Sequence, residues 1–215
     1  MYDGTRNFAK AAMPLLLYAL AGAVAAFELA TLWLSLHPNV NADYRAFYLD
    51  QTTTCMNQPV IGTYNLGKVI SFLPGHYDEA IEVKVCGWEG PVGDGNHSVG
   101  ELSRLRFTFP ETAESLVLKV TLTAIPTAAD LTQHVVFSGN GVVFGHVAIP
   151  ARQTQSFELP MPAAALGQDG HQLDLTLAYP DAIRPEANDS NTRKRAIKIL
   201  SAQLVNAAPG ATPTN

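Results

Sequence analysis

The segment of residues 11–36 is the feature that most constrains how this chain can fold. It is almost wholly apolar and contains one charged side chain, Glu28. A run of about 20 apolar residues lets an α-helix cross the hydrocarbon core of a bilayer, and a longer run does so with some tilt. We therefore predict one transmembrane helix over residues 11–36.

A secretory signal peptide is the alternative interpretation of this segment. Residues 1–10 resemble the basic first region of such a peptide, and residues 23–25 resemble a small-residue cleavage site. Hydrophobicity resumes directly afterwards, at Phe27 and Leu29, and continues to the end of the segment. This continuation favours an uncleaved signal anchor.

The residues that flank the helix predict its orientation. Arg6 and Lys10 precede it, and cytoplasmic flanks carry an excess of Lys and Arg. The long segment that follows is of the kind that is translocated largely regardless of its charge. We expect a single-pass protein of the bacterial inner membrane, with residues 1–10 in the cytoplasm and the domain that follows His37 in the periplasm.

Glu28 indicates that the helix does more than anchor the chain. A charged side chain inside a membrane span costs about 2.5–3.5 kcal/mol on insertion scales. Ala21, Ala25, Glu28 and Thr31 recur at intervals of three or four residues and so share one side of the helix. Because small and polar side chains allow a second helix to approach closely, we predict an integral membrane partner protein on this side. The alternative is a protonated or snorkelling Glu28 that faces the lipid headgroups.

Residues 51–207 have the pattern of an all-β domain. Short runs rich in Val, Ile, Leu, Phe and Thr are separated by Gly, Pro, Asn and Asp about every ten residues. An Asn-Gly pair at residues 140–141 stands between two such runs and predicts a hairpin. We predict an antiparallel, jelly-roll-like β-sandwich. The expected strands are 68–73, 81–88, 103–109, 115–124, 134–138, 142–149, 155–159, 172–179 and 196–205, with a helical turn at 162–166.

Two further segments complete the expected domain organisation. Residues 37–50 form a spacer that contains three aromatic side chains, Tyr44, Phe47 and Tyr48. Residues 208–215 form a polar tail that we expect to be disordered.

The charge distribution argues against nucleic acid as a partner. The formal net charge is -5, and the basic residues are scattered except for Arg193, Lys194, Arg195 and Lys198. A nucleic-acid interface needs a basic face rather than one short cluster. We interpret the cluster as the solvated entry to a strand, and we expect Arg193 to pair with Asp189 and close the loop before that strand.

The two cysteines, Cys55 and Cys86, both fall in the domain that we place outside the cytoplasm. That compartment permits a disulfide, and neither residue has a second Cys or a His at metal-ligand spacing. We predict a Cys55–Cys86 disulfide and no metal site; two buried thiols are the alternative.

The sequence contains no recognisable catalytic motif. It has no G-x-S-x-G nucleophile elbow, no H-E-x-x-H zinc motif, no glycine-rich phosphate loop and no calcium loop. We predict a protein that is not an enzyme and that needs no cofactor.

The stretch around Trp88 is the most distinctive in the domain. It contains Cys-Gly-Trp-Glu-Gly-Pro at residues 86–91, Asn-His-Ser-Val-Gly at 96–100 and the strand that follows, and a second distinctive region covers residues 179–200. Over about residues 60–205 the chain resembles an uncharacterised carbohydrate-binding-like jelly-roll domain. That domain is attached to, or encoded beside, bacterial cell-envelope polysaccharide glycosyltransferases and their membrane proteins.

The resemblance implies a polysaccharide ligand. The glycan-binding candidates are Trp88, Glu89, Asp94 and His97, with sugar contact expected from the loop of residues 89–98. Trp88 has two interpretations, because an indole ring can stack on the apolar face of a pyranose or fill the sandwich core. The apolar strand that precedes it favours the core.

These observations lead to one functional expectation and one rival. We expect a non-catalytic, membrane-anchored accessory subunit of an envelope polysaccharide synthesis or export system. The rival is a structural subunit of another membrane complex, for example an energy-transducing one, in which the sandwich packs on partner proteins. Fold alone does not separate the two, since sandwiches host many functions.

Overall fold

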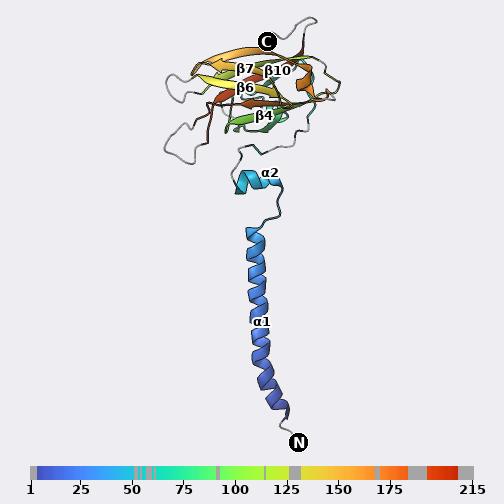
Figure 1. The fold of residues 1–215 in the computed structure, drawn as a ribbon, viewed down its shortest axis with the longest axis vertical. Coiled ribbons are helices and arrows are strands. Elements are labelled where there is room, and N and C mark those ends of the chain that lie inside the picture. Colours follow the sequence, from blue (N-terminus) through green and yellow to red (C-terminus); the bar gives the residue numbers. More distant parts are fainter. Residues whose placement is uncertain are drawn as a thin grey trace. The chain divides into compact units, whose positions relative to one another are not determined.

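The computed structural model describes residues 4–50, 53, 55–56, 60, 62–90, 93–113, 115–125, 132–167, 170–183 and 193–207, with side chains of the first helix described from Pro14 onward. It divides into two compact units, Met1–Ala42 and Asp43–Asn215. Figure 1 shows one long helix in the first unit and layered strands in the second. The predicted tail, residues 208–215, lies outside the described residues.

The first unit is helix α1, Gly4–Leu36. Its segment Pro14–Leu36 is long and apolar enough to cross a membrane, and a signal sequence near an N-terminus has the same properties. The side chains of this segment are exposed along the helix. The helix therefore extends over the predicted residues 11–36 and begins earlier, within the predicted N-terminal segment 1–10.

Two short helical turns, α2 (Ala42–Tyr44) and η1 (Arg45–Leu49), lie where the second unit begins, and Ala42 is the last residue of the first unit. They occupy most of the predicted spacer, for which no helix was expected. Their aromatic rings pack on one another, with ring centroids 4.6 Å apart for Tyr44 and Tyr48 and 4.8 Å apart for Phe47 and Tyr48. These ring contacts stabilise the helical turns of a segment that is too short to form a stable helix on its own.

The strands of the second unit form two antiparallel sheets, so the predicted all-β sandwich is confirmed. One sheet has the order β1-β10-β5-β8, with β3 also paired to β10, and the other has the order β2-β4-β9-β6-β7. The strands are β1 (Val69–Ser71), β2 (Lys84–Cys86), β3 (Asn96–His97), β4 (Leu102–Thr108), β5 (Leu116–Ala124), β6 (Gln133–Gly139), β7 (Val142–Ile149), β8 (Thr154–Met161), β9 (Gln172–Ala178) and β10 (Ile197–Asn206).

Without the short strands β2 and β3, the connectivity is that of a jelly roll. Four strands, β1-β10-β5-β8, face another four, β4-β9-β6-β7, and the chain changes sheets at β1 to β4, β4 to β5, β5 to β6, β7 to β8, β8 to β9 and β9 to β10. Crossing between sheets at nearly every connection is how two Greek keys make a double-sheet jelly roll.

Alternating side chains build one core between the sheets. In β5 the apolar residues Leu116, Leu118, Val120 and Leu122 are buried, and the residues between them are partly exposed. Leu105 and Phe107 of β4 fill the same core from the other sheet. The hairpin predicted at residues 140–141 joins β6 to β7, and both residues have positive φ, as a type I′ turn requires.

The predicted strand 81–88 is wrong in its first half. Tyr77–Ile81 form a short helix, α3, and only Lys84–Cys86 pair as β2. Asp78 and Glu79 lie in the first turn of α3, where carboxylates are favoured by the helix dipole. Ile81 is therefore the last residue of a helix and not part of a strand. Its side chain is 50% exposed.

Candidate functional site

The end of β2 carries Trp88 to the edge of the sandwich. Gly87, directly before it, has φ +74°, a backbone conformation that L side chains rarely adopt. A Cβ at this position would lie 2.2 Å from the carbonyl oxygen of Leu102, so only glycine allows this close approach of β2 to β4. The Ser103 hydroxyl then donates a hydrogen bond to the Gly87 carbonyl at 2.5 Å and fixes the turn into Trp88.

The predicted disulfide is present beside this turn. Cys55 and Cys86 are bonded, with their Cα atoms 4.8 Å apart. The bond ties the segment that precedes the sandwich to β2, next to Trp88. It thereby holds one wall of the site described below.

Trp88 lies half in the core and half at the surface. Its ring packs against the main apolar cluster, with the Phe72 ring centroid 6.2 Å away, and its indole Nε1–H donates to the Arg104 carbonyl at 3.0 Å. The other part of the residue lines an open pocket. The ring therefore contacts the core and also lines the pocket.

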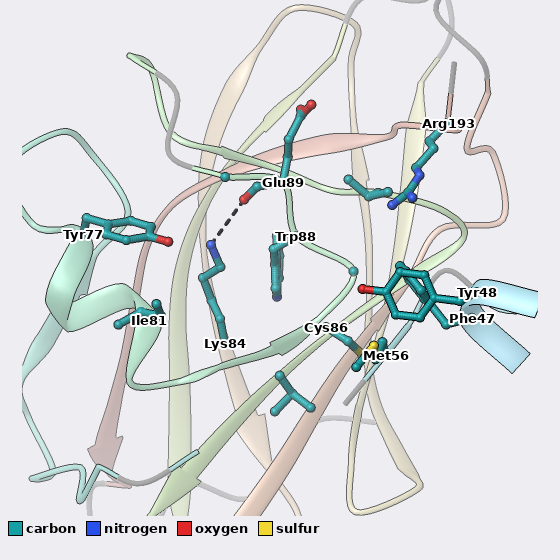
Figure 2. Close-up of a pocket in the computed structure, with 14 residues that line it drawn as sticks. Phe47, Tyr48, Met56, Tyr77, Ile81, Lys84, Cys86, Trp88, Glu89 and Arg193 are labelled. Atoms are coloured by element: carbon teal, nitrogen blue, oxygen red, sulfur yellow. Dashed lines mark hydrogen bonds between the residues drawn. The ribbon is translucent and has the colours of Figure 1, made fainter. Parts of the chain in front are cut away.

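We call this cavity the Trp88 pocket; its volume is about 440 Å³. Figure 2 shows Trp88 between the α3 side, with Tyr77 and Lys84, and the η1 side, with Tyr48. The pocket is lined by Phe47, Tyr48, Met56, Tyr77, Ile81, Lys84, Val85, Cys86, Gly87, Trp88, Glu89, Gly90, Val99 and Arg193. It therefore joins aromatic rings from three separate segments with two cationic side chains.

Lys84 is a polar member of the pocket wall. Its ammonium donates a hydrogen bond to the Glu89 carbonyl oxygen at 3.2 Å and lies 5.5 Å from the centre of the Tyr77 ring. Burial lowers the pKa of Lys84 from its ordinary value, because desolvation disfavours the charged form. The ammonium still retains donors that can meet a bound molecule.

Three of the four predicted glycan-binding residues meet in a charged network. Glu89 Oε1 accepts from Arg195 Nη2 at 2.6 Å, and Glu89 Oε2 lies 3.7 Å from His97 Nδ1. Asp94 Oδ1 lies 3.5 Å from His97 Nε2, and its other oxygen pairs with Lys198. The network joins the loop of residues 89–98 to β10, which is a structural task for these side chains.

His97 is the least exposed of the three, and its surroundings favour the neutral ring. Burial and then the positive charge of Arg195 lower its pKa below the ordinary value of 6.5, although the nearby Asp94 carboxylate acts in the opposite direction. Arg195 Nη1 lies 3.4 Å from His97 Nδ1, so that ring nitrogen accepts from the guanidinium.

The two sequence regions that carry the family resemblance meet in the fold. The fully buried Ser98 hydroxyl accepts hydrogen bonds from the backbone N–H groups of Ala196 at 3.0 Å and Ile197 at 3.1 Å. These motif residues hold the loop against the start of β10. The loop in which sugar contacts were expected is therefore held in place by hydrogen bonds between these two regions.

Among the side chains of the Trp88 pocket that sequence reasoning missed are Tyr48, Tyr77, Lys84 and Arg193. Lys84 shares a strand with Cys86 and precedes Trp88 by four residues. Because alternate residues of a strand lie on the same face, this spacing could have placed Lys84 beside Trp88. The aromatic residues of the spacer were expected to dock on the membrane or on the domain, but nothing in the sequence indicated that Tyr48 would line this pocket. The sequence assigns Arg193 to a solvated cluster and to an ion pair with Asp189, which lies outside the described residues. The structure places Arg193 on the pocket wall, 5.4 Å from the Phe47 ring centre.

The predicted helix-partner residues lie on α1, in the other unit. The Thr31 hydroxyl donates to the Glu28 backbone carbonyl at 2.8 Å, so it is satisfied inside the helix. Ala21, Ala25 and Glu28 remain exposed. Across the residues described, no group of three or more His, Cys, Asp or Glu side chains is arranged to hold a metal ion.

Comparisons with known proteins returned no matching family model and no matching curated protein. Among solved structures, the chain is similar to the CBM36-1 domain of a multidomain xylanase from the hindgut metagenome of Trinervitermes trinervoides, with 8% identity, 66% of this chain and 98% of that chain covered, and a TM-score of 0.38. It is similar to the CBM22-1 xylan-binding domain of a Paenibacillus barcinonensis protein, with 12% identity, coverage of 69% and 99%, and a TM-score of 0.36. It is also similar to a CBM35 domain from Cellvibrio japonicus, with 11% identity, coverage of 72% and 97%, and a TM-score of 0.33.

Proposed function

We propose that this protein is a non-catalytic, membrane-anchored accessory subunit whose sandwich binds a glycan in the Trp88 pocket. Its place would be in bacterial envelope polysaccharide synthesis or export. The observation that carries the proposal is the meeting of Tyr48, Tyr77 and Trp88 with the donors of Lys84 and Arg193 in one cavity. A site of about 300–1,000 Å³ with aromatic walls and a few polar groups is typical of small-ligand recognition.

The pocket suits a sugar because sugars have two kinds of surface. The C–H face of a pyranose packs on aromatic rings, and its hydroxyls need hydrogen-bond partners. Lys84 and Arg193 supply donors at the sides of the pocket. Trp88 is held in place by its hydrogen bond to Arg104, so a stacking surface exists before the ligand arrives.

The anchor and the compartment belong to the same proposal. Helix α1 would tether the domain with its N-terminus in the cytoplasm, and the disulfide between Cys55 and Cys86 suits an oxidising compartment. A reporter that is active only in the cytoplasm, fused after Asn215, should be silent. Activity there would contradict the periplasmic location.

The membrane partner is the second part of the accessory role. Ala21, Ala25 and Glu28 lie exposed along α1 and would face a helix of an integral membrane protein, whose donor could pair with the carboxylate. Thr31 would contribute close packing rather than a hydrogen bond, because its hydroxyl is already used.

A structural role in another membrane complex is the second candidate, and exposed apolar side chains favour it. Ile81 is 50% exposed and Tyr77 is 38% exposed at the pocket wall. In that case the Trp88 pocket would receive a side chain of a partner protein, as interface pockets receive anchor residues.

Glycan binding by the full-length protein separates these candidates. The protein in lipid nanodiscs would be applied to an array of bacterial envelope polysaccharide fragments. We expect retention of at least one glycan, and we expect Tyr48→Ala with Tyr77→Ala to reduce it about tenfold or more, because each stacked ring contributes about 1 kcal/mol. The control is Val143→Ala, an exposed apolar side chain on β7. Absence of any retained glycan would reject the proposal and favour the structural candidate.

A further inference from the structure

Two cations of the Trp88 pocket differ from most others in the domain. Six Lys and Arg side chains of the described sandwich form ion pairs with carboxylates, whereas Lys84 and Arg193 form none with any described residue. The pairs are Lys68–Glu79, Arg106–Asp174, Lys119–Glu158, Lys194–Glu101, Arg195–Glu89 and Lys198–Asp94. Arg152, on an exposed turn, also lies outside these pairs, as do Arg45 and Arg104, each of which has an interaction partner of its own.

Lys84 is half-buried and has no carboxylate partner among the described residues, which points to an anion as the ligand of the pocket. Its side chain is half-buried, and within the described part of the chain the ammonium contacts only a backbone carbonyl and the Tyr77 ring. A half-buried charge without a counter-ion is unfavourable in the free protein. An anion that entered the pocket would pair with the Lys84 ammonium and remove this cost. The free energy of binding would become more favourable by the same amount.

The one carboxylate of the pocket wall is directed elsewhere. Glu89 gives its backbone carbonyl to Lys84, but its carboxylate pairs with Arg195 at 2.6 Å. Figure 2 shows this carboxylate pointing away from Lys84 and Trp88. The same view shows Lys84 and Arg193 on opposite sides of Trp88. The pocket therefore has positive charge on two sides of its central ring.

We infer that the Trp88 pocket selects an acidic glycan, one whose sugar units carry carboxylates, as uronic acids do. This inference rests on the proposed glycan-binding function and specifies its ligand class. A guanidinium accepts a carboxylate in a two-pronged hydrogen-bonded pair, and an ammonium provides a compact charge for a second carboxylate or a ring hydroxyl. Trp88 would stack against the sugar between them.

General attraction to polyanions does not account for such binding. The whole chain has a formal net charge of -5, so a negatively charged polymer is repelled on average. Affinity for an acidic glycan would have to come from the local arrangement of Lys84, Arg193 and the aromatic rings. This local origin is what the following test examines.

The test compares trigalacturonate with its fully methyl-esterified form, which keeps the sugar ring and removes the charge. Isothermal titration calorimetry on the full-length protein in neutral-lipid nanodiscs should show at least tenfold tighter binding of the acid. Lys84→Gln and Arg193→Gln should each weaken binding of the acid about tenfold and weaken binding of the ester much less, because glutamine keeps a neutral donor for sugar hydroxyls and removes only the charge that a carboxylate recognises. Lys119→Gln and Arg152→Gln remove one positive charge elsewhere and should change neither.

The outcomes distinguish the inference from the function on which it rests. Equal affinity for acid and ester would overturn the acidic-glycan inference while glycan binding stands, and no binding of any glycan would overturn both. Preference for phosphorylated or sulfated oligosaccharides over trigalacturonate would also overturn it, because it would assign the cations to another anion. Lys84→Arg should recover most of the affinity lost in Lys84→Gln, and a failure of both variants with intact circular dichroism would contradict a role for the charge.

Discussion

The indole Nε1–H of Trp88 donates to the backbone carbonyl oxygen of Arg104 at 3.0 Å, which ties the end of β2 to the neighbouring strand β4. This one bond explains how a residue at the edge of the sandwich can be both structural and exposed. The nitrogen is satisfied, one part of the ring packs on the core, and the rest is presented to the pocket. A rigid aromatic wall costs little further ordering when a ligand binds.

Removal of the Trp88 ring should destabilise the domain. We expect Trp88→Ala to lower the free energy of unfolding by about 3 kcal/mol, the lower end of the range for buried aromatic side chains, because the ring is partly exposed. Trp88→Phe should cost less, since it retains most of the packing and loses the bond to Arg104. Urea denaturation followed by circular dichroism measures both. Wild-type stability of Trp88→Ala would show that the ring is a surface platform alone.

The disulfide should stabilise the same corner of the domain. Its two cysteines are 31 residues apart in sequence, and closing a loop of this size contributes about 3.7 kcal/mol in the chain-entropy model. Cys55→Ala with Cys86→Ala should therefore lower the unfolding midpoint and loosen the wall of the Trp88 pocket. Mass spectrometry without reductant should find no thiol open to alkylation. Two alkylated thiols in the native protein would refute the bond.

Acidification should weaken the network around His97 before the carboxylates titrate. The pKa of His97 is lowered in the folded state, so as the pH falls below about 6.5 the unfolded chain takes up a proton that the folded chain does not. The stabilising effect is complete above pH 6.5 and is lost as the pH falls towards the folded-state pKa. Denaturation midpoints between pH 7.5 and 5 measure this slope. His97→Gln should flatten it, whereas His146→Gln, an exposed change on β7, should not; equal slopes in all three proteins would contradict the assignment.

The exposed side of α1 should hold a membrane partner. Glu28→Leu with Ala25→Leu removes the polar group and adds bulk, so we expect loss of co-purification with the partner in mild detergent while the protein stays in the membrane. Ala23→Leu with Ala30→Leu adds similar bulk on the opposite side of the helix and serves as the control. Unchanged co-purification after the first pair of changes would argue against this interface.

The sandwich was accessible from sequence because its signals are local and repeated. In β5, the buried residues Leu116 to Leu122 alternate with partly exposed residues that are mostly polar, and the Asn140-Gly141 turn fixes a hairpin. Each of these elements therefore indicates its own structure. The short helix α3 was missed because Ile81 and Val83 continue the apolar pattern of the strand that follows. Five residues are too few for a helical period to be distinguished from a strand.

The Trp88 pocket could be predicted only in part. Trp88 was identified, and Glu89, Asp94 and His97 were expected to contact sugar, but the structure places these three in a network with Arg195 and Lys198. The other walls come from Tyr48, Tyr77 and Arg193, which are distant in sequence. Their meeting depends on how β2 passes α3 and η1, and no pattern within one segment contains that information.

Direct observation of Trp88 during glycan titration is the measurement that tests the account most sharply. The chain has two tryptophans, so Trp33→Phe leaves Trp88 as the one fluorophore of this kind in the full-length protein. In nanodiscs, trigalacturonate should produce a saturable change in Trp88 emission, with the same midpoint as the calorimetric titration, as the sugar covers the exposed part of the ring. The methyl ester should produce a smaller change or require higher concentration. Unchanged emission throughout a titration in which calorimetry shows the acid binding would place the ligand elsewhere and contradict the Trp88 pocket as its site.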